Sequence, residues 1–147
     1  MSFTSRQRVR FGDCDPAGIG YYPRLLALVD AAIEEWIEAT LGLGRKELVA
    51  GLGLGLPTAD LKVGFGRPCQ LGETLDMRIV PLRLGWTSIT LLLTATANGE
   101  ARFSATLVQV LLTTANGEPT PWPAEWRARI SASMPAPAPG AMMVSDV

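Results

Sequence analysis

The chain has 147 residues, a hydrophobic fraction of 48%, 13 basic against 14 acidic residues and a formal net charge of -1. It contains no histidine, which excludes charge-relay triads, histidine-dependent dehydration and histidine-containing zinc sites. Its basic residues are scattered, which argues against nucleic-acid binding. We therefore expect no metal, no cofactor and no nucleic-acid partner, and any catalysis must use carboxylates, backbone dipoles or the two cysteines.

The length fits a single domain, which can bury about two thirds of its unfolded surface. No apolar run reaches the roughly 20 residues that span a bilayer, and residues 1–6 lack the apolar region of an export signal. We expect a cytoplasmic protein without membrane contact. In that compartment Cys14 and Cys69 are expected to be free thiols rather than a disulfide.

Residues 3–11 alternate in a way that is typical of a β-strand with one wet, basic face. After a turn rich in Gly, Asp and Pro, Pro23 lies where the first-turn proline of a helix over residues 24–40 belongs. The apolar side chains of this helix cover an arc of about 120°. They are Leu25, Leu26, Val29, Ile33, Trp36 and Ile37. This helix is expected to be the core of the fold, with one face covered by another element.

Gly42 and Gly44 are expected to end the helix, residues 45–50 to add one turn, and residues 51–57 to form a flexible loop. Most of the remaining chain is predicted to be β, and Asn98-Gly99 is a two-residue hairpin signal. The expected strands cover residues 59–65, 74–84, 87–97 and 101–113, and a short helix is expected within residues 121–130.

This order of elements predicts an α+β fold in which one curved, five-stranded antiparallel sheet wraps around the first helix. We expect the single domain to span residues 1–131. Residues 132–147, rich in proline and alanine, are expected to form a disordered tail.

Residues 11–23 read Phe-Gly-Asp-Cys-Asp-Pro-Ala-Gly-Ile-Gly-Tyr-Tyr-Pro and place acids just before the predicted helix. For Asp13 and Asp15, a purely structural role in the turn is an equally good interpretation. Small residues after Asp15 would let the backbone approach a ligand. The helix start presents free N–H groups that can stabilise an oxyanion by about 3 kcal/mol per donor. Together these features point to acyl chemistry at Asp15.

Two further residues have competing interpretations. Cys14 has no imidazole to deprotonate it, and the flanking carboxylates are expected to raise its pKa, so we do not expect a catalytic thiol. Asp30 lies at the edge of the apolar arc of the helix. It could contact a polar substrate atom, but an acid at the boundary of a buried face explains it equally well.

The run from Phe11 to Ile19, followed by Tyr22-Pro23 and Asp30-Ala31-Ala32, resembles the 4-hydroxybenzoyl-CoA thioesterase family, which has the hotdog fold. The resemblance extends in order over residues 3–130 and includes Pro123-Ala124-Glu125-Trp126 near its end. It implies an acyl-CoA thioesterase. In that family the acid matching Asp15 attacks the thioester carbonyl or activates water, and the backbone N–H matching Tyr22 holds the oxyanion. An acid matching Asp30 can meet a ring hydroxyl.

The chain departs from the family at the turn after the third strand, where members often hold the CoA phosphates with a basic cluster. Only Arg83 is basic there, so either it acts with Lys62 or Arg67, or the carrier binds differently. Ser88, which ends a Gly-x-x-Ser pattern, is a weaker candidate for substrate binding. Tyr21 and Trp86 are candidates for contact with an aromatic acyl group, although plain packing explains such residues more often.

The resemblance therefore predicts hydrolysis of an aromatic, hydroxybenzoyl-like acyl-CoA to free acid and CoA. The alternatives are a short- or medium-chain aliphatic acyl-CoA thioesterase and a non-catalytic acyl-CoA-binding module. A hydratase is disfavoured because the chain has no histidine. A single hotdog leaves strand edges and one sheet face uncovered, so a homodimer or a homotetramer built as a dimer of dimers is expected, with sites between subunits.

Overall fold

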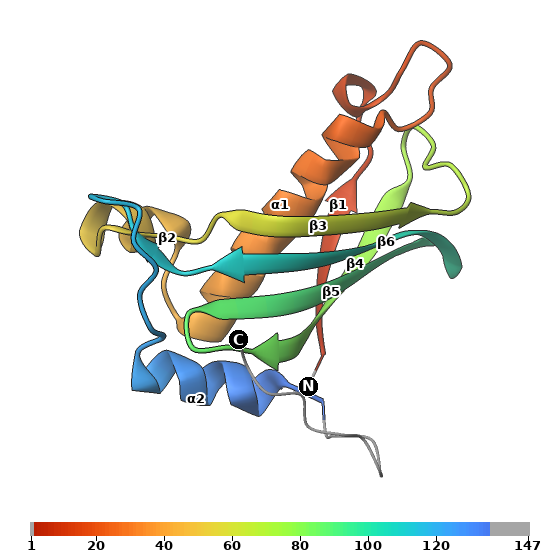
Figure 1. Cartoon of the computed structure of the whole chain (residues 1–147). Coiled ribbons are helices and arrows are strands. Elements are labelled where there is room, and N and C mark those ends of the chain that lie inside the picture. Colours follow the sequence, from red (N-terminus) through yellow and green to blue (C-terminus); the bar gives the residue numbers. More distant parts are fainter. Residues whose placement is uncertain (1, 136–147) are drawn as a thin grey trace.

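The computed structural model describes residues 2–135, and within them a curved antiparallel sheet of five strands wraps around one long helix, α1 (Tyr22–Leu41) (Figure 1). Both the α+β class and this arrangement were predicted from the sequence and are confirmed. Along the sheet the order is β1 (Phe3–Arg8), β4 (Thr74–Leu84), β5 (Ser88–Ala97), β6 (Glu100–Val110) and β3 (Thr58–Phe65). The two edges of the sheet are therefore β1 and β3.

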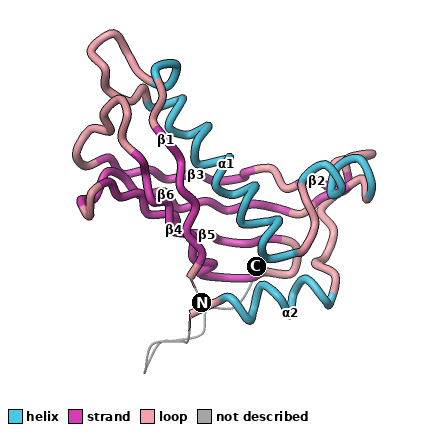
Figure 2. The backbone as a smooth tube through the Cα atoms, turned by 180° about the vertical axis from the view of Figure 1, so that it is seen from behind, coloured by secondary structure: helices cyan, strands magenta, loops and turns pink. Residues whose placement is uncertain are grey.

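Helix α1 begins two residues before the predicted start, with Pro23 in its first turn. Its end at Gly42 is as predicted: Gly42 adopts φ 78°, a left-handed conformation that suits glycine, and its N–H donates to the Glu38 carbonyl at 3.0 Å. Of the predicted apolar arc, all side chains are buried except Leu26, which is half-buried, and Trp36 is only 1% exposed. Figure 2 shows α1 lying across the strands.

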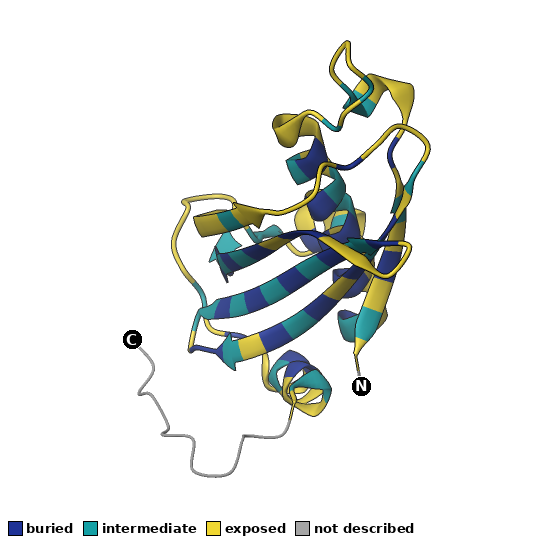
Figure 3. Cartoon of the chain, turned by 90° about the vertical axis from the view of Figure 1, so that its right-hand side faces the viewer, coloured by how far each residue is buried: buried dark blue, intermediate teal, exposed yellow. Residues whose placement is uncertain are grey.

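β5 shows the alternation of a strand with one buried face: every second residue is buried and the residues between are half-buried (Figure 3). The hairpin between β5 and β6 forms where it was predicted. Asn98 (φ 53°) and Gly99 (φ 77°) both adopt the left-handed conformation that a type I′ turn requires.

The predicted strand over residues 101–113 is divided in the structure. β6 ends at Val110, and the Leu111 N–H donates to the Thr87 carbonyl at 2.8 Å. The chain then leaves the main sheet, and β7 (Leu112–Thr113) pairs with β2 (Leu54–Gly55), which lies inside the predicted flexible loop. That part of the loop prediction is wrong, because an interaction across the chain orders the segment.

Three short elements complete the fold: η1 (Phe11–Asp13), the single turn η2 (Glu47–Gly51) and helix α2 (Ala124–Ser133). Helix α2 contacts α1 and β4 and continues beyond residue 131, where the domain was expected to end (Figure 2). Of the expected tail, residues 136–147 lie outside the described residues. Among residues 2–135, no helix has the length and apolar character needed to cross a membrane.

A buried ion pair joins the turn before β4 to the start of β6. The side chains of Glu73 and Arg102 are 13% and 8% exposed, and Arg102 Nη2 lies 2.6 Å from Glu73 Oε2. Burial alone would raise the pKa of Glu73, but the Gln70 N–H and the Arg102 guanidinium more than offset it, so this pKa lies below its ordinary value. Nearby, burial raises the pKa of Cys69 to about 11, and both cysteines are free thiols as predicted.

Replacing Glu73 with glutamine is expected to lower the free energy of unfolding by about 3 kcal/mol near neutral pH, because Arg102 would keep a buried charge without its partner. The folded pKa of Glu73 is depressed, so its stabilisation is present above the unfolded pKa and is lost as the pH falls through the folded pKa. Urea unfolding of both proteins near pH 7 and near pH 3 measures this. An equal difference in stability at the two pH values would contradict the assignment.

Candidate active site

Asp13 holds the two ends of the loop between β1 and α1. Its Oδ2 accepts the Arg10 N–H at 2.9 Å, and its backbone carbonyl accepts the Tyr21 N–H at 2.8 Å. Both bonds are made to backbone groups of the chain, one at the start of η1 and the other at the start of α1. The geometry therefore gives Asp13 a structural role.

Asp15 is fixed in the same loop but keeps an exposed carboxylate. Its Oδ1 accepts the N–H groups of Ala17 at 2.9 Å and Ile19 at 3.1 Å, and its own N–H donates to the Ile19 carbonyl at 2.8 Å. Gly18 turns the loop at φ 78°. These bonds use one carboxylate oxygen, so Oδ2 can face a ligand. A structural role of Asp15 in the turn is therefore compatible with a catalytic role of its carboxylate.

The Asp15 loop borders a depression of about 570 Å³. Its lining is Phe11, Cys14, Asp15, Pro16, Ala17, Gly18 and Leu71. Phe11 is 84% exposed and Leu71 is 49% exposed. A carboxylate that lies among exposed apolar side chains is suited to a ligand with an apolar part.

Helix α1 begins at Tyr22, six residues after Pro16. The N–H groups of Arg24 and Leu25 both donate to the Tyr21 carbonyl, at 2.9 and 3.0 Å, and Pro23 has no N–H. Tyr22 thus carries the first amide of the helix, which has no acceptor within the helix. The N-cap residue Tyr21 makes no side-chain cap bond among the described residues. The positive end of the helix dipole is therefore available to an anionic oxygen.

Tyr21 and Tyr22 also present their rings at this end of the molecule. They are 53% and 59% exposed, and their ring centroids lie 5.7 Å apart in an edge-to-face arrangement. The loop and the helix start thus bring Asp15, Tyr21 and Tyr22 to one end of α1. Contact of Tyr21 with an acyl group stays a prediction.

Arg83 and Ser88 lie at the opposite end of the sheet. β1 pairs with β4 so that Arg8, just before the Asp15 loop, faces Thr74, and Arg83 follows nine residues later along β4. At about 3.3 Å per residue this is a separation of roughly 30 Å. One chain therefore does not bring Arg83 and Asp15 to the same thioester group.

The other basic residues considered for the phosphates do not join Arg83 within one chain. Arg67 follows β3 and pairs with Glu100 at 2.8 Å, at the start of β6 and far from Arg83. Lys62 lies on the edge strand β3, three strands away from β4. The sheet thus separates these three cations.

Arg127 is a basic residue at the turn between β4 and β5 that sequence reasoning missed. Its Nη2 donates to the Gly85 carbonyl at 2.6 Å, and its guanidinium lies 5.6 Å from the centroid of the Trp86 ring. No local pattern signals this contact, because it forms only when α2 docks on the sheet. A side chain on Gly85 would collide with the Ser88 hydroxyl, so the Gly-x-x-Ser pattern is explained by the turn itself.

Cys14 has the properties expected of a structural thiol. Burial raises its pKa, and the charges of Asp13 and Asp15 raise it further, as the sequence predicted. Its Sγ donates to the Arg10 carbonyl at 3.4 Å. The thiol is therefore held protonated by its surroundings.

Replacing Cys14 with serine is expected to leave the rate of thioester hydrolysis within about twofold of wild type, because serine keeps a donor for the Arg10 carbonyl. Steady-state assays of the two proteins with one acyl-CoA measure this. A rate of hydrolysis lowered a hundredfold or more would show that the Cys14 thiol takes part in the reaction.

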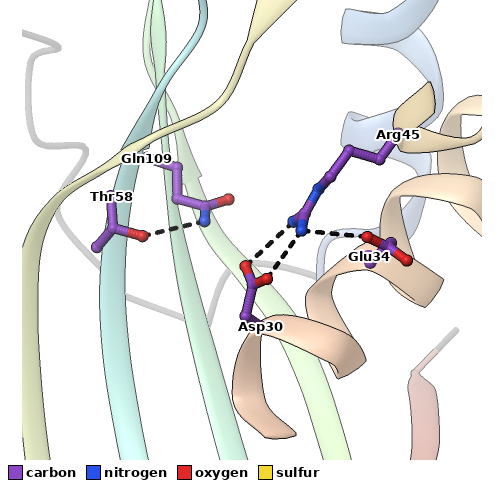
Figure 4. A network of polar contacts seen from close by, with 5 residues as sticks. All are labelled: Asp30, Glu34, Arg45, Thr58 and Gln109. Carbon is purple, nitrogen blue, oxygen red and sulfur yellow. Dashed lines mark hydrogen bonds and ion pairs between the residues drawn. The ribbon is translucent and has the colours of Figure 1, made fainter. Parts of the chain in front are cut away.

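Asp30 lies two turns along α1 and takes part in an ion-pair network (Figure 4). Arg45 binds it in a bidentate manner, with Nη1 2.8 Å from Oδ2 and Nη2 3.2 Å from Oδ1. The same Nη1 lies 3.2 Å from Glu34 Oε1. The bond with Asp30 raises the pKa of Arg45. Asp30 is thus a boundary acid with a partner, and its contact with substrate stays a prediction.

A small apolar cavity of about 110 Å³ lies between α1 and the edge of the sheet, beside Asp30. Its lining is Leu26, Val29, Asp30, Ile33, Thr58, Leu61 and Leu107. Most of these side chains are apolar, and the two polar ones come from α1 and β3. The cavity is suited to an apolar group that carries one polar substituent.

A family model described as the thioesterase-like superfamily matches residues 9–130, which include the Asp15 loop and every strand of the five-stranded sheet except β1. The chain belongs to the thioesterase-like superfamily. This confirms the family resemblance and the hotdog fold inferred from residues 11–23. A crystal structure of a thioesterase superfamily protein from a Jannaschia species matches with a TM-score of 0.85 and 29% identity, over 92% of this chain and 94% of that chain.

Two curated relatives match shorter parts of this thioesterase-like chain. The 1,4-dihydroxy-2-naphthoyl-CoA hydrolase of Nostoc punctiforme is 33% identical over 85 residues, which are 58% of this chain and 57% of that protein. The 4-hydroxybenzoyl-CoA thioesterase of a Pseudomonas species is 37% identical over 65 residues, which are 44% of this chain and 46% of that protein. The chain thus spans about half the length of the curated relatives that it matches.

Proposed function

We propose that the chain hydrolyses the thioester of an aromatic, hydroxybenzoyl-like acyl-CoA to a free acid and CoA. The observation that carries this proposal is the exposed carboxylate of Asp15, fixed by two backbone N–H groups one loop before the uncapped start of α1. The curated relatives, which are named for naphthoyl-CoA and hydroxybenzoyl-CoA substrates, support the aromatic class.

In this proposal the thioester carbonyl oxygen accepts the Tyr22 N–H, and the helix start stabilises the negative charge that develops on that oxygen. One such donor contributes about 3 kcal/mol in the transition state. Asp15 acts in one of two ways. It attacks the carbonyl carbon to form an anhydride and release CoA, after which water cleaves the anhydride, or it removes a proton from the water that attacks. Both routes consume one water.

We further propose that the site is shared between copies of the chain, as a homodimer or a dimer of dimers. Asp30 follows Tyr22 by eight residues, or about 12 Å along the helix, and Arg83 and Ser88 lie farther still from Asp15. A second copy can bring Asp30 and Arg83 to the acyl and phosphate ends of one bound substrate. Roles in substrate binding for Tyr21, Asp30, Arg83 and Ser88 belong to this proposal.

Strand β3 is the edge that we propose for the pairing of two copies. All but one of its eight residues are exposed, and among them Leu61 and Phe65 are 43% and 54% exposed. The other edge, β1, carries two like charges, Arg6 and Arg8, which oppose edge-to-edge association, whereas the two charges of β3, on Asp60 and Lys62, have opposite signs. Pairing along β3 would cover apolar surface and satisfy unpaired backbone groups.

We also propose that the protein acts in the cytoplasm as one domain, which extends past the predicted boundary at residue 131 to the end of α2 at Ser133. The free thiols of Cys14 and Cys69 support a location in the reducing cytoplasm. The match of one family model to residues 9–130 supports a single domain.

A panel of acyl-CoA esters, assayed by the release of free thiol, tests the proposed function. We expect kcat/KM for benzoyl-type esters to exceed that for butyryl- and octanoyl-CoA at least tenfold. A preference for the aliphatic esters would support the short- or medium-chain alternative. Tight binding of the esters without thiol release would support the non-catalytic binding module and contradict the proposal.

A further inference from the structure

Gln109 is a buried polar residue on the face of β6 that packs against α1. It is 2% exposed, and its neighbours on this face of the strand, Leu107 and Ala105, are apolar. Its Nε2 donates to Thr58 Oγ1 at 3.2 Å, on the paired strand β3. Its Oε1, by contrast, is buried and has no hydrogen-bond partner among the described residues. Such an atom costs free energy unless a ligand satisfies it.

The 110 Å³ cavity lies next to this amide. Leu107 lines the cavity and precedes Gln109 by two residues on the same face of β6, and Thr58, which orients the amide, lines it too. An apolar cavity of about 150 Å³ holds benzene. The cavity of about 110 Å³ beside Gln109 is smaller, so it suits the substituted edge of an aromatic ring rather than a whole ring.

The other polar group of the cavity already has a partner. Both carboxylate oxygens of Asp30 are bonded to Arg45, whereas the amide of Gln109 is turned toward the same gap between β3 and α1 (Figure 4). The acceptor that stays without a donor is therefore the Gln109 oxygen rather than the Asp30 carboxylate.

We propose that Gln109 determines specificity for the acyl group, with its Oε1 accepting a hydrogen bond from a hydroxyl on the aromatic ring. Thr58 acts as the positioning residue, which orients the amide. This inference rests on the proposed thioesterase function and adds the residue that selects a hydroxylated ring. It holds whether the amide meets a substrate bound to its own chain or to a second copy.

The test compares 4-hydroxybenzoyl-CoA and 3-hydroxybenzoyl-CoA with their fluoro analogues, which are similar in size but lack the donor. For the better hydroxylated ester, the wild type is expected to show a preference in kcat/KM of about 10- to 100-fold over the fluoro analogue. Gln109→Met, which keeps the shape but removes the acceptor, is expected to reduce the preference to within about twofold. Its activity on the fluoro ester should change little. Gln70→Met, the same change at an exposed glutamine, serves as the control.

A preference that survives in Gln109→Met, no preference in the wild type, or an equal loss on both esters would overturn the proposal. If Gln109→Met does not fold, Thr58→Val decides, because it frees the amide without removing it and should lower the preference severalfold. If the wild type releases no thiol at all, the proposed function has failed. The ratio of the affinities for the intact esters, measured by calorimetry on the wild type and Gln109→Met, then tests Gln109 alone.

Discussion

Replacing Asp15 with asparagine is expected to lower kcat for thioester hydrolysis by about 10³-fold while the fold and substrate binding persist. The asparagine oxygen can still accept the N–H groups of Ala17 and Ile19, which hold the loop through Oδ1 alone. The change therefore removes the carboxylate charge and its basicity with little disturbance of the backbone. Thiol release under saturating substrate measures kcat, and thermal unfolding reports on the fold.

Asp13→Asn is the matched control for this prediction. Asp13 lies two residues away in the same loop, and asparagine can still accept the Arg10 N–H. Its turnover is expected to stay within a few fold of wild type. If Asp15→Asn retains full hydrolysis, or if both variants lose activity equally, then the assignment of the carboxylate is wrong.

Placing a charge on the β3 edge is expected to separate the subunits and abolish most of the turnover. Phe65 is 54% exposed near the end of β3, and in an edge-to-edge dimer Phe65→Asp would bury a carboxylate without a partner. A cost of about 3 kcal/mol corresponds to a dissociation constant raised by roughly a hundredfold. Light scattering across a concentration series measures the mass, and assays at the same concentrations show whether turnover follows the assembly.

The control for this second prediction is Thr4→Asp on the opposite edge of the sheet. Thr4 is exposed on β1 and faces Arg78 of β4 in the register of the sheet. A carboxylate at this position is therefore tolerated, because it lies opposite a positive charge. This variant is expected to keep the mass and the activity of wild type. A wild-type protein that is monomeric and still turns over would contradict the shared site.

Local patterns were enough to predict much of the fold. The strand predicted over residues 74–84 has the same bounds as β4, and Asn98-Gly99 marks the hairpin between β5 and β6 because few other residues tolerate that turn. Pairing of β2 with β7 was missed, because two-residue strands carry no periodic signal and depend on a contact between distant segments.

The candidate site shows the same division between local and distant information. Residues 11–23 are contiguous, so the position of Asp15 before the helix start could be read from the sequence. The bonds of Arg45 to Asp30, of Arg127 to the turn at Gly85 and of Gln109 to Thr58 join distant segments. Their partners become known only when the strand order and the docking of the helices place them together.

A carboxylate and a helix start are proposed to cleave a thioester in a protein without histidine. Mass spectrometry of the products formed from 4-hydroxybenzoyl-CoA in ¹⁸O-labelled water, over many turnovers, tests this proposal. We expect free CoA and an acid whose carboxylate carries the label, with neither product formed at an appreciable rate by Asp15→Asn. Recovery of the intact thioester after incubation with the wild-type protein would contradict it.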